Sequence, residues 1–399
     1  MSIRSALVIG GGISGPVTAA ALRRAGIDAT VFEAYPGPAY GIGANLALAP
    51  NGVAALEIVG AADPVRALAV PVSRSSMSVN GKRFDLPGLR DIEPLRVIDR
   101  ADLHQALHDS AVAAGVRFEY DKRLVDVEEH AGGVTALFAD GSDATADVLI
   151  GADGIRSTVR TLVDPQAPGP TYLRMLSFGA YTDCALDLEP ETMTFAFGKR
   201  AYYLYWPMPD GRVSWGANLP SQQYFSLTEA RAVPAEQWLR TLRDVYAGED
   251  PGERLARATT PAQLSVVGAL HIMPSVPHWY RGRMVLTGDA IHAPSNTSGQ
   301  GASLAIESAV ELARCLRDID DPARAFATYE ALRRPRVEGV AARVARMNQT
   351  KAAGPIARKA MQWMMPLMFK RMDPEKLLGG EQRFRIDWEA TVRPEPVPA

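Results

Sequence analysis

The chain has 399 residues, of which 47% are hydrophobic and 22% charged, as is typical of a globular protein with a large core. A formal net charge of -2 argues against nucleic-acid binding through broad phosphate neutralisation. Cys184 and Cys315 are too few for a disulfide framework and lie in no Cys/His cluster. These features exclude a basic nucleic-acid binder, a disulfide-rich secreted domain and a structural zinc protein. We expect a reducing, cytoplasmic location.

One segment superficially resembles a signal peptide or a membrane span, because the chain carries no charge from Ser5 to Leu22. Four glycines and Pro16 lie at its centre, however, which suits a tight turn between two elements better than one apolar helix. We therefore expect no targeting segment and no membrane helix.

The chain opens with a pattern of strand, turn, helix and strand. Ala6–Ile9 is a short apolar run of the kind found in buried parallel strands. The turn follows at Gly10–Gly15, and Pro16 suits the first position of the next helix. Gly26 is expected to end that helix, and Ala29–Phe32 forms the second strand.

The middle of the chain predicts two kinds of structure. A helix is expected near Ala101–Ala114, and strands are expected at 117–120, 124–129, 134–138 and 148–150. Between about Tyr172 and Leu219 the pattern becomes alternating and aromatic-rich, which is typical of an antiparallel sheet. From Val285 the chain returns to strand, turn and long helix. The pattern predicts a discontinuous α/β domain of the Rossmann type, an inserted antiparallel β-sheet domain and a C-terminal helical segment.

The first motif that carries chemistry is Gly10–Gly15, a G-x-G-x-x-G sequence between strand and helix. Gly10 permits the turn, Gly12 lets the backbone approach a pyrophosphate, and Gly15 allows close packing of helix on strand. The positive end of the helix then faces the phosphates. Glu33 ends the next strand, where a carboxylate can accept hydrogen bonds from ribose hydroxyls. The motif predicts dinucleotide binding without separating FAD from NAD.

Two further motifs follow predicted strands. Gly151–Arg160 reads GADGIRSTVR, and Arg283–His292 reads RMVLTGDAIH. The last is followed by Gly299, Gln300 and Gly301 at the start of a helix expected to run from Ala302 to Asp318. A helix N-terminus preceded by glycines can hold an anionic ring oxygen.

Together these motifs resemble the single-component flavoprotein aromatic hydroxylases of the para-hydroxybenzoate hydroxylase type, over about residues 3 to 335. The resemblance implies FAD as the cofactor. It implies a FAD-binding domain from segments 1–71, 97–170 and 266–335, a substrate domain from 72–96 and 171–265, and a C-terminal helical segment over 336–399.

The family pattern also implies roles for individual residues. Glu33 would bind the adenosine ribose, Arg100 the flavin nucleotide and Asp289 the ribityl or pyrophosphate region. Asp153 would lie near the pyrophosphate and the path of the nicotinamide donor. Backbone N–H groups of Gly299, Gln300 and Gly301 would face the pyrimidine edge of the flavin ring. The other residues placed at the cofactor are Gly10, Gly12, Ile13, Ser14, Gly15, Ala34, Gly288 and Ala302.

The resemblance implies the reaction as well. In the family, flavin reduced by NADH or NADPH reacts with O₂ to give a C4a-hydroperoxide, which delivers OH to an electron-rich ring. The cofactor carries out the difficult step, whereas the protein supplies orientation, a dry pocket and charge stabilisation. We therefore expect a monooxygenase that hydroxylates an aromatic or polycyclic small molecule, polyketide-like compounds included. The enzyme is expected to be a monomer or homodimer.

Several residues near the expected pocket are less specific. Asn296 replaces a proline of the family pattern, and it either tunes the oxygen chemistry or is neutral; we favour the neutral interpretation. His271 is a weak candidate for the flavin or substrate site, and we expect His292 to be structural, bonded to backbone. Tyr203, Tyr205 and Trp215 lie on predicted strands that could cover the flavin ring, although a core position is equally compatible with their pattern.

Other functions remain compatible with the same fold. One is an FAD-dependent reductase or oxidase, or a halogenase, although the Trp-x-Trp-x-Ile-Pro sequence of the halogenases is missing. Another is a non-catalytic flavoprotein that binds or sequesters an aromatic ligand. The sequence does not distinguish NADH from NADPH, nor a biosynthetic role from a catabolic or drug-inactivating one.

Overall fold

The computed structural model describes residues 2–38, 45–79, 81–295, 299–351 and 371–394. Asn296 therefore lies outside the described residues, as do four of the methionines of the expected C-terminal segment, Met361, Met364, Met365 and Met368. No helix in the described part of the chain is long and apolar enough to cross a membrane.

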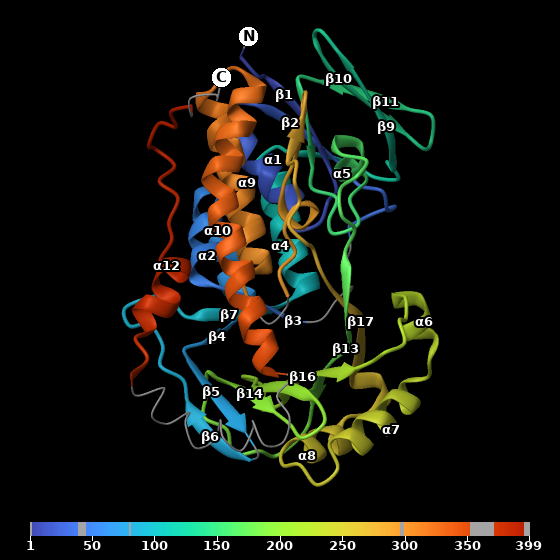
Figure 1. Ribbon diagram of the computed structural model, residues 1–399, viewed down its shortest axis with the longest axis vertical. Helices are drawn as coiled ribbons and strands as arrows, with labels where there is room; N and C mark the ends of the chain where they lie inside the picture. Colours follow the sequence, from blue (N-terminus) through green and yellow to red (C-terminus); the bar gives the residue numbers. More distant parts are fainter. Residues whose placement is uncertain (1, 39–44, 80, 296–298, 352–370, 395–399) are drawn as a thin grey trace.

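A six-stranded sheet forms the centre of the upper half of the molecule (Figure 1). Its order is β18-β19-β12-β1-β2-β8, and all neighbours are parallel except β18 and β19. The central strands β1, β12 and β19 are apolar and buried because both faces of the sheet are covered. Their bounds are β1 Ser5–Ile9, β2 Asp28–Phe32, β8 Arg117–Glu119, β12 Val148–Gly151, β18 Tyr280–Arg281 and β19 Met284–Leu286.

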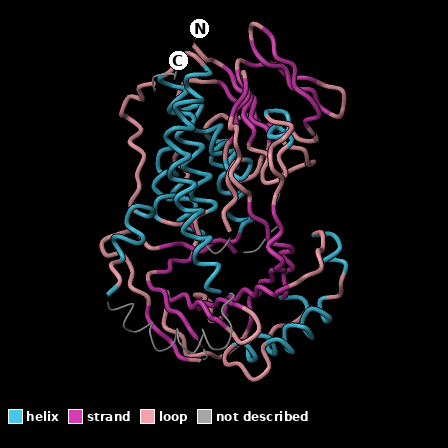
Figure 2. The backbone as a smooth tube through the Cα atoms, viewed as in Figure 1, coloured by secondary structure: helices cyan, strands magenta, loops and turns pink. Residues whose placement is uncertain are grey.

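The first helix, α1, spans Ser14–Arg24 and therefore begins two residues before the predicted start at Pro16. Pro16 still costs no hydrogen bond, since the first four N–H groups of a helix have no partner within it. Gly26 follows the helix at a φ of 80°, as expected for a glycine that ends a helix. α1 packs against α9 (Gly301–Asp318) and α4 (Arg100–Ala113), and Figure 2 shows these helices gathered beside the sheet.

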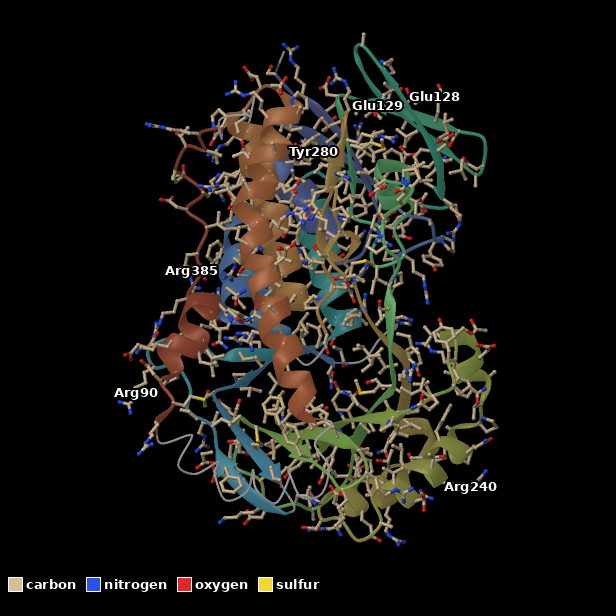
Figure 3. All side chains as sticks on the ribbon, in the orientation of Figure 1. Arg90, Glu128, Glu129, Arg240, Tyr280 and Arg385 are labelled. Atoms are coloured by element: carbon tan, nitrogen blue, oxygen red, sulfur yellow. The ribbon has the colours of Figure 1, made fainter. Side chains whose placement is uncertain are left out.

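Three strands were predicted before the aromatic-rich region, at 117–120, 124–129 and 134–138, and they belong to two different sheets. β8 extends the parallel sheet, whereas β9 (Leu124–His130) and β10 (Gly133–Phe138) pair with β11 (Asp143–Ala146) in a separate antiparallel sheet. Glu129, labelled at the top of Figure 3, accepts a hydrogen bond of 2.7 Å from the backbone N–H of Arg283. This contact joins the sheet of β9, β10 and β11 to the turn between β18 and β19.

The lower half contains a seven-stranded sheet in the order β17-β13-β16-β15-β14-β5-β6. It was expected to be antiparallel, but β14 and β5 pair in parallel, so the sheet is mixed. The reason is that β5 comes from an earlier segment, so no hairpin fixes its direction. The bounds are β5 Arg74–Val79, β6 Lys82–Asp85, β13 Thr171–Thr182, β14 Thr192–Phe197, β15 Tyr202–Pro207, β16 Val213–Pro220 and β17 Leu264–Ile272.

Helices cover one face of the seven-stranded sheet, and a small sheet connects its other face to the upper half (Figure 1). The covering helices are α6 Leu227–Ala232, α7 Ala235–Val245 and α8 Gly252–Ala258. The small sheet has the order β3-β7-β4, with bounds Asn45–Leu48, Leu95–Asp99 and Val70–Val72. The remaining short elements are α2 Pro50–Ile58, α3 Ala62–Leu68, α5 Thr158–Val163, η1 Pro261–Gln263 and η2 Gly288–Ala290.

The C-terminal part is held by charged groups. The long helix α10 spans Pro322–Lys351, and its Arg333 and Arg336 each pair at 2.7 Å with Glu307 of α9, which is fully buried. After the short turns η4 (Glu375–Gly379) and α12 (Gly380–Gln382), the described chain contains no further helix. Among its described residues, 336–351 and 371–394, the expected helical segment is partly helical, and residue 336 lies inside α10.

Candidate active site

Gly10 and Gly15 of the first motif are tightly packed against neighbouring backbone, whereas Gly12 has open space beside it. Gly10 has a φ of 103°, and a Cβ there would lie 2.6 Å from the carbonyl oxygen of Ala152. A Cβ at Gly15 would overlap the carbonyl oxygen of Gly10. At Gly12, in contrast, an added Cβ meets no described atom within 4 Å. The backbone is therefore accessible to a ligand at Gly12 and packed on both sides of it.

The three sequence motifs meet at the N-terminus of α1. The N–H of Ala152 donates to the carbonyl oxygen of Ile9 at 2.8 Å, which joins the second motif to the first. A Cβ at Gly288 would lie 2.8 Å from the Cβ of Ser14, so the third motif contacts the same turn. The buried Arg160 donates to the carbonyl oxygens of Ala290 and Ile155, both at 2.9 Å. The motifs form one cradle, and Arg160 links two of them, a role that sequence reasoning missed.

Glu33 and a missed histidine hold the glycine-rich loop. One carboxylate oxygen of Glu33 accepts from the N–H of Gly11 at 2.7 Å, and the other accepts from the N–H of Tyr35 at 3.0 Å, beyond the half-buried Ala34. From α4, the buried His104 donates through Nε2 to the carbonyl oxygen of Gly11 at 2.6 Å, and burial lowers the pKa of this histidine. The helix that carries His104 was predicted from the sequence, and this was the signal that could have pointed to the histidine.

Three charged residues predicted for the cofactor lie around this cradle. The backbone of Asp153 lies against Gly10, and its carboxylate caps α5 by accepting from the N–H groups of Thr158 and Val159 at 2.7 and 3.1 Å. Burial raises the pKa of Asp289, and the nearby charge of Arg100 opposes this shift. Arg100 is exposed and makes no ion pair within the described part of the chain. A cation without a partner beside the cradle fits a phosphate group.

The start of α9 lies next to the three-stranded sheet formed by β3, β7 and β4. Gly299 has a φ of 60°, and a Cβ there would lie 3.7 Å from the Cβ of Ala47 on β3. The buried Gln300 precedes the helix, and its side-chain oxygen accepts from Asn51 Nδ2 at 3.0 Å. The side chain of Gln300 therefore turns toward the protein, whereas Gly301 and Ala302 in the first turn remain half-buried.

The cradle is compatible with a dinucleotide. Ser14 is 6% exposed, and its hydroxyl has no hydrogen-bond partner among the described residues. It lies in the first turn of α1, next to the accessible backbone of Gly12 and Ile13. The N–H groups at this end of α1 have no partners within the helix. A pyrophosphate would satisfy these donors, and the exposed Arg100 would add a positive charge.

The two faces of the seven-stranded sheet differ, and the difference corrects one prediction. Side chains alternate along each strand, so Tyr203, Tyr205 and Trp215 share one face. They are 1%, 6% and 2% exposed and pack in a core with Trp238 and Tyr246 of the covering helices. We call this the outer face. These three aromatics cannot cover a flavin ring, because α7 and α8 lie between them and solvent on that side.

The opposite face is turned toward the cradle, and we call it the inner face; it carries Tyr181, Leu204, Ser214 and Gly216. Asn45 of β3 donates to Ser214 Oγ at 2.8 Å, which fixes the orientation of this face. Leu204 packs with Val97 of β7 in a small core. Since Ala47 of β3 also lies next to Gly299, the same short strand contacts both the inner face and the start of α9.

The remaining candidates lie elsewhere. His271 of β17 packs with the rings of Tyr172 and Tyr224, each at a centroid distance of 5.8 Å, and no hydrogen bond joins it to the three motifs in the described residues. His292 is structural, as expected, but its Nε2 contacts Ser308 Oγ at 2.9 Å instead of backbone. Burial lowers the pKa of His292 to about 3, so this side chain is neutral near neutral pH.

A cavity of about 270 Å³ lies between α10 and the segment after η2. Trp279, His292 and Arg334 line it, together with mostly apolar residues. No residue of the inner face contributes to this cavity. It is therefore separate from the face that β3 places opposite the cradle.

Comparison with known proteins agrees with this geometry. A family model described as an FAD binding domain matches residues 4–344. The 3-hydroxybenzoate 6-hydroxylase of Klebsiella oxytoca is 30% identical over 355 residues, which cover 84% of this chain and 85% of that protein. The 3-amino-4-hydroxybenzoate 2-monooxygenase PtmB3 of Streptomyces platensis is 35% identical over 356 residues, with coverage of 84% and 85%.

The fold is similar to solved structures over nearly its whole length. Klebsiella pneumoniae HpxO complexed with FAD and uric acid superposes with a TM-score of 0.80 and 26% sequence identity. The match covers 95% of this chain and 96% of HpxO.

Proposed function

Because the chain belongs to the FAD-binding-domain family and is a single-component FAD-dependent aromatic hydroxylase, we propose that it uses NADH or NADPH and O₂ to hydroxylate a small, already hydroxylated ring compound. The predicted family, α/β fold class, enzyme class and FAD cofactor are confirmed by the family match and by the FAD-bound relative. The nicotinamide donor, the oxygen chemistry and the ring substrate are our proposal.

The observation that carries the proposal is that β3 connects the inner face with the start of α9. The start of α9 and the inner face both contact β3, through Ala47 and Asn45 respectively. A ring compound bound on the inner face would therefore lie next to the segment that leads into α9. The named relatives act on hydroxybenzoate and aminohydroxybenzoate, which supports a planar, hydroxylated substrate.

The chain's own residues would bind and orient the reactants. The N-terminus of α1, Ser14 and Arg100 would hold the pyrophosphate of FAD, and the start of α9 would face the ring system with its backbone donors. Bound FAD supplies the electron transfer and the oxygen activation. In the overall reaction, ring C–H, O₂, NAD(P)H and a proton give ring C–OH, water and NAD(P)⁺.

The test uses the FAD-loaded enzyme with a panel of hydroxybenzoates, urate and phenolic polyketides. NADH and NADPH consumption, O₂ uptake and peroxide release are measured together, and products are analysed after reaction under isotopically labelled O₂. We expect one panel member to stimulate NAD(P)H oxidation and to gain one labelled oxygen atom. Stimulated oxidation with stoichiometric peroxide and no labelled product would indicate an oxidase, and no stimulation by any compound would indicate a binding protein.

A further inference from the structure

A series of buried polar contacts runs from the start of α9 through α2 to α10. Asn51 of α2 is 1% exposed and donates through Nδ2 to Gln300 Oε1 at 3.0 Å and to Glu307 Oε1 at 2.7 Å. Glu307, in the second turn of α9, pairs in turn with Arg336 of α10 at 2.7 Å. α9 packs against both α2 and α10, as Figure 1 shows. The contacts therefore join three helices around one buried carboxylate.

The charges give these contacts a fixed direction. Burial alone would raise the pKa of Glu307, but the nearby charges of Arg333 and Arg336 lower it, so the side chain is a carboxylate that only accepts hydrogen bonds. The side-chain amide of Asn51 must therefore direct its NH₂ group toward Glu307. The same NH₂ group binds the oxygen of Gln300, the residue directly before α9. The ionised Glu307 thus determines the orientation of a side chain at the start of α9.

The other end of the series is the C-terminal tail, residues 371–394. Arg336 donates to the carbonyl oxygens of Gly380 and Glu381 at 3.0 and 2.8 Å. Its guanidinium group lies 3.9 Å from the centre of the half-buried Phe384 ring, which is within the range of a cation–π interaction. The tail thus fixes one of the two arginines that bind the buried carboxylate. We call the contacts from Gln300 to this tail the relay.

The start of α2 and the start of α9 are packed closely against each other. The N–H of Ala49 donates to Ser303 Oγ at 3.0 Å, and a Cβ at Gly52 would lie 2.6 Å from the same oxygen. Ala49 directly follows β3, the strand that also contacts the inner face. A displacement of Asn51 would therefore displace the backbone at the start of both helices.

We propose that Asn51, Glu307 and Arg336 are positioning residues through which the C-terminal tail holds the start of α9 in place, and that they thereby set the reduction potential of bound FAD. The inference rests on the proposed function, which places the backbone donors of this helix end at the flavin ring. Two electrons and one proton reduce FAD to a singly charged anion, so these donors stabilise reduced FAD more than oxidised FAD. If the start of α9 is held less firmly, part of this difference is lost and the potential falls, although the cradle still binds FAD.

The first test is the midpoint potential of FAD in Asn51→Ala, measured by anaerobic titration of the FAD-loaded enzyme against a reference dye. The substitution removes both hydrogen bonds without adding bulk. We expect the affinity for reduced FAD relative to oxidised FAD to fall about tenfold, which lowers the potential by about 30 mV. A fluorescence titration should show that oxidised FAD still binds. An unchanged potential in the fully loaded variant would overturn the proposal.

The second test separates the relay from a general loosening of the tail. Phe384→Leu removes an aromatic ring from Arg336. The matched control is Trp388→Leu, which removes a ring of the same tail from Arg317, outside the relay. We expect the ratio of affinities to fall about threefold in Phe384→Leu, or about 15 mV, and to stay unchanged in Trp388→Leu. Phe384→Tyr keeps the ring and should keep the potential.

The control also distinguishes positioning from stability. Trp388 is 8% exposed and more deeply buried than Phe384, so a purely structural role of the tail predicts the larger effect in Trp388→Leu. Equal shifts in the two variants, or an unchanged potential in Phe384→Leu, would overturn the proposal. If Asn51→Ala loses FAD altogether, the comparison of the two tail variants decides.

These potentials are measured without substrate, nicotinamide or oxygen. Their failure to shift would contradict the relay and leave the proposed hydroxylation intact. Absence of labelled product in the oxygen experiment would contradict the hydroxylation and leave the relay intact.

Discussion

The two faces of the seven-stranded sheet are made by the same strands, yet they differ in what they leave unfilled. On the outer face, Tyr203 and Trp215 pack edge-on against Tyr246, with ring centroids 5.0 and 6.1 Å apart. On the inner face, Gly179 and Gly216 lie opposite each other, and both are half-buried. The outer face stabilises the sheet, whereas the inner face keeps a surface on which a ring can lie. A strand pattern alone does not tell which face is which.

The difference follows from packing. Large aromatic side chains bury much apolar surface and fix each other's orientation, so a filled face is rigid. Trp215 adds a polar restraint, because its Nε1 donates to Thr182 and Thr259 at 3.1 and 3.0 Å. A rigid outer face allows the inner face to carry two glycines, Gly179 and Gly216, side by side. The comparison therefore predicts that changes on the outer face alter stability and that changes on the inner face alter binding.

The largest expected effect is that of Trp215→Ala on the outer face. Removing a buried indole should lower the free energy of unfolding by about 3–5 kcal/mol, because the rigid surroundings cannot close the cavity. Urea denaturation of the FAD-loaded enzyme measures this change. Binding of the panel compound that stimulates NAD(P)H oxidation should persist in the variant at low temperature. Loss of this binding without loss of stability would show that Trp215 belongs to the binding face.

The same distinction between filled and unfilled space applies to two glycines of the cradle. Gly15 is packed against Gly10, whereas an added Cβ at Gly12 meets no described atom. Gly12→Val should therefore fold but bind FAD at least about 100-fold more weakly, a loss of roughly 2.7 kcal/mol. Flavin content after dialysis and a fluorescence titration measure this loss. Gly169→Val is the matched control, because a Cβ there is equally unobstructed and lies outside the motifs. Full FAD occupancy in Gly12→Val would contradict the cradle.

A smaller effect separates two neighbours on one strand, Gly216 and Ala217. Gly216→Val places a side chain on the inner face, so the affinity for a ring ligand should fall about tenfold, or roughly 1.4 kcal/mol, with little change in stability. Ala217→Val adds methyl groups to the outer core and should lower stability by about 1–3 kcal/mol through overpacking. Ligand titration and urea denaturation of both variants check this reversal. Equal effects of the two variants on binding would remove the distinction between the faces.

Features that form within one short stretch of the sequence were predictable, whereas features that bring distant segments together were not. Gly10, Gly12 and Gly15 were assigned from local sequence because their roles arise within one strand-turn-helix unit, and the structure places them as that unit requires. For Tyr203, Tyr205 and Trp215 the sequence was equally compatible with a core position and a pocket position, and the structure places all three in the outer core. Alternation shows that the three share a face, but which face is inner depends on how β3 docks. The contacts that Asn51 makes with Gln300 and Glu307 were missed because they join residues 249 and 256 positions apart in the sequence.

The smallest expected effect concerns the pH dependence of stability that arises from Asp99 of β7, next to the inner face. Burial raises the pKa of Asp99 in the folded protein, so the folded state holds this proton to a higher pH than the unfolded chain does. As the pH rises from about 4, near the unfolded pKa, toward neutrality, the folded protein must ionise a buried carboxyl and loses stability. Asp99→Asn removes this titration. The variant should therefore gain stability relative to the unaltered enzyme as the pH rises from about 4 to about 7. Urea denaturation at both pH values measures the difference, and a relative loss on raising the pH would mean that hydrogen bonds to the ionised Asp99 outweigh its burial.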